Sequence, residues 1–314
     1  MRRWIVLGVW VTAALLAALF YGQLHFSARP LPHEYKVGVV LKAMDSEHWL
    51  AVRSSMEKAA RAHNMRLIVM APENERAYAE QEQIVRDLLA ADVDALVVAP
   101  VDIDRATVYT EMAAARGVPL LTIDERITGV PYIGSDNYAI GQMAAAYMAK
   151  RLPAGSTVGI LAGVAQQDAH RQRVAGFRDY VREHGGLRVA AVRMDAAQYS
   201  EAARQTERMM EEQPDLAGLF VTSAIMSLGA VDTLSARASS PVLVGVDTQN
   251  DALRALRDGR MDAIISQDGN DTGRMAVEAV RDTLAGHTIP ANSFVPNALI
   301  TAANAQDYLL QEDF

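Results

Sequence analysis

Short apolar runs alternate with longer amphipathic segments along most of the chain, and this alternation is the feature that most limits its fold. The first four runs span residues 36–41, 66–70, 95–99 and 120–124. Between them, the patterns over 49–63, 78–90 and 104–116 predict helices. Uninterrupted apolar strands that alternate with helices of this length indicate a parallel sheet with helices on both faces.

A second series of the same kind begins near Gly134, with a helix predicted over residues 137–151. Further strands are predicted at 158–162, 188–194, 218–222, 242–246 and 263–266, and a last helix at 272–285. Because 314 residues exceed what one core usually accommodates, we expect an α/β protein with two similar lobes. The expected limits are a signal segment at 1–28, a linker at 29–35, a first lobe at 36–135, a second lobe at 136–268, and a return to the first lobe with a C-terminal tail at 269–314.

The N-terminus has the composition of an export signal. Met1-Arg2-Arg3 precedes an uncharged apolar run from Trp4 to Phe20, which is slightly short for a membrane-spanning helix. Basic residues before such a run stay in the cytoplasm, so the rest of the chain is expected outside it. A cleaved signal peptide and an uncleaved signal anchor, which would hold the protein at the membrane, both remain open.

Composition excludes several classes of function. The net charge is −8 and no basic run follows the N-terminus, so we expect no nucleic-acid partner. The chain has no cysteine, which excludes disulfides, thiolate catalysis and cysteine-based zinc sites. No metal, organic cofactor or catalytic residue is expected.

Polar side chains stand where apolar strands end, and ligands of parallel α/β sheets bind at that edge. The carboxylates of Asp124 and Asp247 could each accept from two hydroxyls, while Arg173 offers a planar fork of donors. Gln267 both donates and accepts, and Trp49 could lie along an apolar ring face. Each residue also has a structural explanation, since Asp is common in turns, Arg173 could be a solvated helix charge and Trp49 could be core.

Several motifs occur in register along the chain. They include Asp45-Ser46-Glu47-His48-Trp49, Asp92 to Pro100, Gly117-Val118-Pro119, Thr122-Ile123-Asp124, Gly134 to Tyr138 with Gly141, Arg173 with Gly176-Phe177, Pro214-Asp215, Gly245-Val246-Asp247 and Gln267. With them, residues 36–303 resemble the ribose-type, sugar-binding branch of the periplasmic binding proteins. The resemblance implies a type 1 fold of two lobes joined by a hinge, which closes over a small polar ligand such as a sugar or polyol.

The resemblance also implies a set of ligand-binding residues: Ser46, His48, Trp49, Asp124, Glu125, Arg173, Tyr199, Ser223, Asp247 and Gln267. Three of these positions depart from the family pattern. His48 replaces an aromatic residue, Glu125 stands where relatives place Arg or Ser, and Ser223 stands where relatives carry an amide. These departures leave the identity of the ligand open.

Four classes of function can be weighed for a protein with two α/β lobes. A receptor that delivers its ligand to an ABC permease agrees best with the strand-end residues, and a membrane-anchored sensor for a kinase or chemoreceptor is the alternative. An enzyme would need a catalytic group such as His48 beside Asp45 and Glu47, but no catalytic motif is present. A LacI-type regulator would need a DNA-binding segment where the apolar N-terminus stands, so we reject it.

Overall fold

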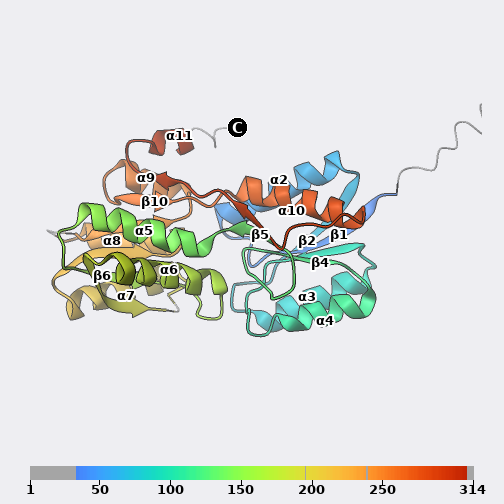
Figure 1. Cartoon of the computed structure of the whole chain (residues 1–314), viewed down its shortest axis with the longest axis horizontal. Coiled ribbons are helices and arrows are strands. Elements are labelled where there is room, and N and C mark those ends of the chain that lie inside the picture. The colour runs from blue at the N-terminus through green and yellow to red at the C-terminus, as the bar shows by residue number, and fades with distance from the viewer. Residues whose placement is uncertain (1–32, 195, 238–239, 310–314) are drawn as a thin grey trace, which may run out of the picture. The chain divides into compact units, whose positions relative to one another are not determined.

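The apolar runs form the strands of two sheets (Figure 1). The computed structural model describes residues 33–194, 196–237 and 240–309, and within these residues each sheet has six strands. The expected signal segment at 1–28 lies outside the described residues, as does most of the expected linker. None of the helices in the described ranges is both long and apolar enough to cross a membrane.

The first sheet has the strand order β11-β5-β4-β3-β1-β2, with neighbouring strands parallel. Its strands are β1 (Tyr35–Val40), β2 (Met65–Met70), β3 (Ala95–Val98), β4 (Leu120–Ile123), β5 (Tyr132–Ser135) and β11 (Asn292–Val295). Its helices are α2 (Glu47–Ala62), α3 (Tyr78–Ala90), α4 (Thr107–Arg116) and α10 (Gly269–Leu284). We call this sheet and its helices the first lobe.

The second sheet has the order β12-β10-β9-β8-β6-β7, in which β12 alone of the described strands runs antiparallel to its neighbour. Its strands are β6 (Ser156–Leu161), β7 (Leu187–Arg193), β8 (Leu216–Val221), β9 (Val242–Val246), β10 (Ala263–Ile265) and β12 (Leu299–Ile300). The helices of this second lobe are α5 (Asn137–Arg151), α6 (Asp168–His184), α7 (Tyr199–Glu212), α8 (Ala224–Ser235), α9 (Asn250–Arg257) and α11 (Ala305–Leu309).

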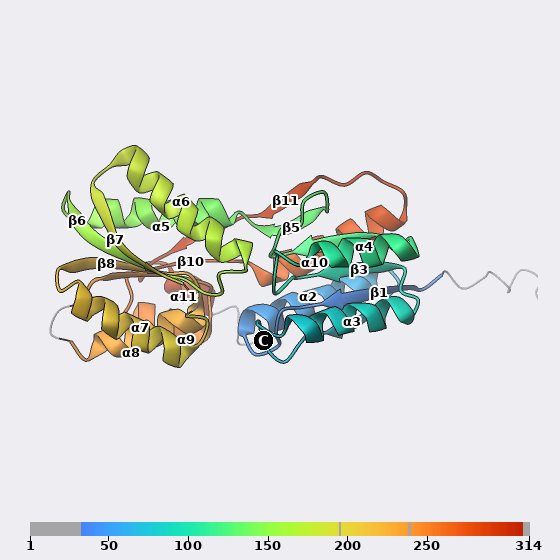
Figure 2. The ribbon, with the colours of Figure 1, turned by 90° about the horizontal axis from the view of Figure 1, so that it is seen from below.

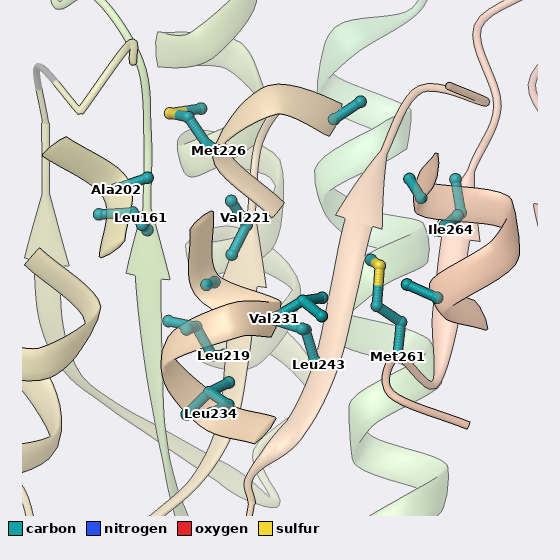
Figure 3. Packing of buried hydrophobic residues seen from close by; sticks show 14 of the residues in the cluster. Leu161, Ala202, Leu219, Val221, Met226, Val231, Leu234, Leu243, Met261 and Ile264 are labelled. Carbon is teal, nitrogen blue, oxygen red and sulfur yellow. The ribbon is translucent and has the colours of Figure 1, made fainter. Parts of the chain in front are cut away.

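Side-chain alternation along the strands gives each sheet a core on both faces. In β3, Ala95 and Val97 pack under α2 and α10, whereas Leu96 and Val98 pack against α3 and α4. In the second lobe, α5 and α6 cover one face, and α7, α8 and α9 cover the other (Figure 2). Figure 3 shows the second of these cores, where Leu219 and Leu243 meet Val231 and Leu234 of α8. The expected fold class is confirmed, because both predicted series form parallel sheets flanked by helices.

The described chain passes from one sheet to the other three times: between β5 and α5, between β10 and α10, and between β11 and β12. Within residues 269–314, α10 and β11 belong to the first lobe. The short β12 instead pairs with β10, and α11 packs against α9. The sequence shows only one apolar segment there, at 297–300, so it does not reveal that this part of the chain is shared between the lobes.

Candidate functional site

A cavity of about 430 Å³ lies between the carboxyl ends of the two sheets. Its walls come from the loops that follow the strands and from the first turns of the helices that those loops enter. Both lobes contribute, with Trp49 and Asp124 from the first and Arg173 and Asp247 from the second. A site of this size and position is typical for small-molecule binding in parallel α/β folds.

The start of α2 holds an aromatic pair in the wall. Ser46 is the N-cap, and its hydroxyl accepts the backbone N–H of Trp49 at 3.4 Å. Trp49 is 4% exposed, and its ring meets the His48 ring edge-on, with centroids 5.1 Å apart. Trp49 therefore belongs both to the core under α2 and to the cavity wall, so its two sequence interpretations are compatible.

Asp124 and Asp247 both directly follow central strands, and both have left-handed backbones, with φ of 63° and 75°. Few residues other than Gly adopt this region, and Asp is among those that tolerate it. Both residues line the cavity. Oδ1 of Asp247 is buried and has no hydrogen-bond partner within the described residues. Buried acceptors of this kind are commonly paired with ordered water or a ligand.

Lys42 is a cavity residue that the sequence analysis did not identify. It follows β1, is 2% exposed, and its Nζ lies 2.5 Å from both Asp124 Oδ2 and Glu125 Oε1. Burial alone would raise the pKa of Asp124, but the charges of Lys42 and Arg173 outweigh burial and lower that pKa to about 2. Asp124 is therefore an ionised acceptor at neutral pH. The sequence feature that could have identified Lys42 is its position as a single lysine at the end of an apolar run.

Glu125 does not line the cavity. It is 0% exposed and lies behind Lys42, where Oε2 accepts the backbone N–H of Ala169 at 3.1 Å. Burial and the nearby charge of Asp124 raise the pKa of Glu125, and the charge of Lys42 lowers it. Burial is the largest of these effects, and the resulting pKa is about 7. The structure thus separates Glu125 from the other nine expected residues, all of which lie along the cavity wall.

Arg173 is buried on α6 and is oriented by three neutral oxygens. Its Nε donates to Asn137 Oδ1 at 2.9 Å, one terminal nitrogen to the Thr222 carbonyl at 2.6 Å, and the other to Gln267 Oε1 at 2.8 Å. These three bonds use three of the five N–H groups of the guanidinium, which leaves two for a ligand. The solvated-charge interpretation of Arg173 does not hold, because the residue is only 3% exposed.

Close contact between α5 and α6 fixes the position of Arg173. A Cβ added to Gly141 would lie 2.0 Å from the Arg173 carbonyl oxygen, and one added to Gly176 would lie 2.0 Å from that of Tyr138. Both positions therefore need glycine for the two backbones to touch. This contact gives a physical reason for the Gly141 and Gly176 motifs.

His170 is a second cavity residue that the sequence analysis missed. It precedes Arg173 by three positions on α6, so both side chains share one helix face. Its Nδ1 lies 2.7 Å from Thr222 Oγ1, and a Cβ on Gly163 would lie 2.3 Å from its Nε2. Burial, together with the charges of Arg173 and Lys42, lowers the pKa of His170 well below its ordinary value. His170 is thus a neutral, fixed ring in the wall.

Three further expected residues lie along the second-lobe wall. Tyr199 begins α7, is 39% exposed, and donates its hydroxyl to Asp232. Ser223 precedes α8 and its side chain makes no capping bond. Gln267 follows β10 and is held by Arg173. In the part of the chain that the structure describes, no group of three or more His, Cys, Asp or Glu residues could hold a metal ion.

Comparison with known proteins agrees with this geometry. The family model described as "Periplasmic binding protein domain" matches residues 37–288. The chain belongs to this family. Its members are binding proteins of the extracytoplasmic space and not enzymes, so the enzyme alternative based on His48 is excluded.

Relatives of this periplasmic binding protein include the ribose import binding protein of Bacillus subtilis, which is 28% identical over 85% of this chain and 88% of the relative. The D-ribose/D-allose-binding protein of Pseudomonas aeruginosa is also 28% identical, over 82% and 84% of the two chains. An ABC transporter solute-binding protein from Burkholderia multivorans has a similar fold, with a TM-score of 0.80 and 27% identity. That alignment covers 86% of this chain and 100% of the solved one, which holds an unknown ligand represented as α-D-erythrofuranose.

Proposed function

We propose that the protein is a solute-binding protein that encloses a sugar or sugar-like polyol between its lobes and delivers it to an ABC transporter. The observation that carries this proposal is the composition of the cavity wall. Fixed acceptors at Asp124 and Asp247, fixed donors on Arg173 and an aromatic face at Trp49 surround one space of sugar size. The relatives that are named for ribose and allose binding support the same ligand class.

Each proposed contact follows from the chemistry of hydroxyl groups, which both donate and accept. A hydroxyl that donates to Asp247 Oδ1 would supply the missing partner of that atom. The two N–H groups of Arg173 that remain can serve neighbouring hydroxyl oxygens. Trp49 and His48 would cover an apolar C–H face of the ring, with Tyr199 across the cavity. Ser46, Ser223 and Gln267 would complete the ring of polar contacts.

Charge balance favours a neutral ligand. Near the cavity, Lys42, Glu125 and Arg173 are buried, and Asp124 and Asp247 are partly buried. Burial favours the neutral form of Glu125. Lys42 is already engaged by two carboxylates, so it offers little to an anion. A neutral polyol satisfies the wall without adding an unpaired charge to a buried site.

We propose further that residues 1–28 direct export, either as a cleaved signal peptide or as an anchor in the membrane. The anchored form would also suit a sensor that reports ligand to a membrane kinase or chemoreceptor. The mass of the protein recovered from cells, and its division between the soluble and membrane fractions, distinguish the two forms.

Binding is tested by calorimetric titration of the purified protein with pentoses, hexoses and cyclic polyols. We expect one of them to bind with a single site per chain. A folded protein that binds none of these compounds contradicts the proposal.

A further inference from the structure

Several polar contacts join the two lobes at the start of α6, beside the proposed ligand contacts in the cavity wall. The side chain of Gln167, from the second lobe, is held at both ends by the first lobe. Its Oε1 accepts from Lys42 Nζ at 3.2 Å, and its Nε2 donates to Glu75 Oε2 at 3.0 Å. Gln167 is 1% exposed, so these bonds are shielded from water.

Glu125 makes the next contact by acting as the cap of a helix in the other lobe. The N-cap residue of α6, Gln167, makes no capping bond with its own side chain. Instead, Glu125 of the first lobe accepts the N–H of Ala169, in the first turn of α6. Unpaired N–H groups and the positive end of the helix dipole both favour an acceptor of this kind.

These contacts depend on the lobes being together but not on a ligand. Lys42, Glu125 and the salt bridges with Asp124 lie within the first lobe and persist when the lobes separate. The bonds to Gln167 and Ala169 exist only while the lobes meet. The bond from Lys42 to Gln167 has a charged donor and is therefore stronger than a neutral hydrogen bond, so its formation favours the closed arrangement.

We propose that Lys42, Glu75 and Glu125, acting on Gln167 and Ala169, form a clasp that stabilises the closed arrangement of the lobes without ligand. Lys42 and Glu125 are then positioning residues. Lys42 fixes Asp124 in the cavity wall, and Glu125 draws α6 toward the first lobe, together with Arg173. A protein that is partly closed before binding gains apparent affinity in proportion to its closed fraction.

The chain has no cysteine, which allows the closed fraction to be measured with a pair of dyes. Arg61→Cys on α2 and Arg208→Cys on α7 place one exposed label on each lobe, in the full chain without ligand. Single-molecule energy transfer then gives the closed-to-open ratio. We expect a measurable closed population, which Glu125→Ala and Gln167→Ala each reduce about tenfold, as expected for the loss of about 1.4 kcal/mol.

Two further variants test whether the change in closed population comes from the clasp bonds themselves and not from any substitution between the lobes. Glu125→Gln keeps an oxygen for Ala169 N–H, so it should retain most of the closed population that Glu125→Ala loses. Arg171→Ala removes an exposed contact across the same seam, the 3.2 Å pair with Asp104, whose side chains are 40% and 62% exposed. Such exposed pairs are weak, so the ratio should change less than about twofold.

The proposal is overturned if the ligand-free protein shows no closed population, or if both alanine variants close as often as the parent. Circular dichroism confirms folding, and Gln167→Ala, which leaves the buried charges paired, carries the test if Glu125→Ala does not fold. The measurement contains no ligand. A negative result for the clasp therefore does not contradict the proposal of sugar binding, and a negative result for sugar binding does not contradict the clasp.

Discussion

At the residue scale, we propose that single residues at the ends of central strands determine what this cavity can bind. Asp247 combines a left-handed backbone with a buried oxygen that has no partner in the described chain. Left-handed backbones at residues other than Gly, and buried acceptors without a protein partner, both occur preferentially at functional sites. Both features are explained if the carboxylate is kept for a ligand hydroxyl.

Asp247→Asn should therefore weaken sugar binding about 10- to 100-fold, because hydrogen bonds to a charged group are worth about 1.5–3 kcal/mol. Asparagine also tolerates a left-handed backbone, so the fold should be kept. Calorimetric titration measures the loss. Asp251→Asn, on the exposed side of α9, is the control and should bind as the parent does. Full affinity in Asp247→Asn would remove Asp247 from the ligand contacts.

Glu125 gives a pH dependence whose sign follows from its pKa. The folded-state pKa is raised to about 7 from an ordinary value of 4.5, so the folded protein disfavours the charged form. The contribution of Glu125 to stability is then greatest below about pH 4.5 and declines as the pH rises to about 7. Each unit of pKa difference is worth about 1.4 kcal/mol.

Glu125→Gln does not titrate, so it should lack this decline. We expect the melting temperature of the variant, relative to the parent, to increase by a few degrees between about pH 4.5 and 7. Thermal unfolding of both proteins across this range makes the comparison. A difference that stays constant or shrinks would show that the pKa of Glu125 is not raised.

At the scale of elements, the contact between α5 and α6 links the packing of the second lobe to its binding residues. Backbone meets backbone at Gly141 and Gly176, and Arg173 projects from the same part of α6. Displacement of α6 would therefore move Arg173 relative to Gln267 and Asn137, which orient its guanidinium.

Gly176→Ala should destabilise the protein by about 1–3 kcal/mol or more, since the added methyl must displace the α5 backbone. It should also weaken ligand binding, because Arg173 moves with α6. Denaturant unfolding and titration measure the two effects. Arg178→Ala, an exposed position on the same helix, should change stability by less than about 0.5 kcal/mol. Equal stability of Gly176→Ala and the parent would mean that the helices do not need this close contact.

The elements that could be predicted from the sequence are those with a strong apolar signal. β1, β3 and β8 are mostly buried apolar runs, so the expected strands and the parallel arrangement follow from pattern alone. The two-residue β12 has no such signal, and its pairing with β10 depends on tertiary contacts. The positions of Asp124 and Asp247 in the cavity wall were predictable because each directly follows a strand with a clear apolar signal.

The residues that sequence reasoning misplaced or missed are polar groups defined by partners far along the chain. Glu125 is next to Asp124 in sequence, but its bonds to Lys42 and Ala169 span 83 and 44 positions. His170 is held by Thr222, 52 positions away. A single sequence without tertiary contacts does not show which of two adjacent carboxylates faces a cavity and which turns behind it.

At the scale of the whole molecule, ligand binding and lobe closure are two parts of one equilibrium. The cavity walls come from both lobes, so a ligand that contacts both favours the closed arrangement over any in which they separate. The clasp at the start of α6 acts on the same equilibrium without ligand. Function thus depends on contacts that no single lobe contains.

The central claim is that this cavity binds a neutral sugar or polyol. A thermal-shift screen of the purified protein against pentoses, hexoses, cyclic polyols and charged small metabolites tests it most directly, since a ligand of the native state raises its stability. We expect at least one neutral sugar or polyol to raise the melting temperature, and the Asp247→Asn variant to lose most of that shift. A shift produced only by charged metabolites, or by none of the compounds, would contradict the account.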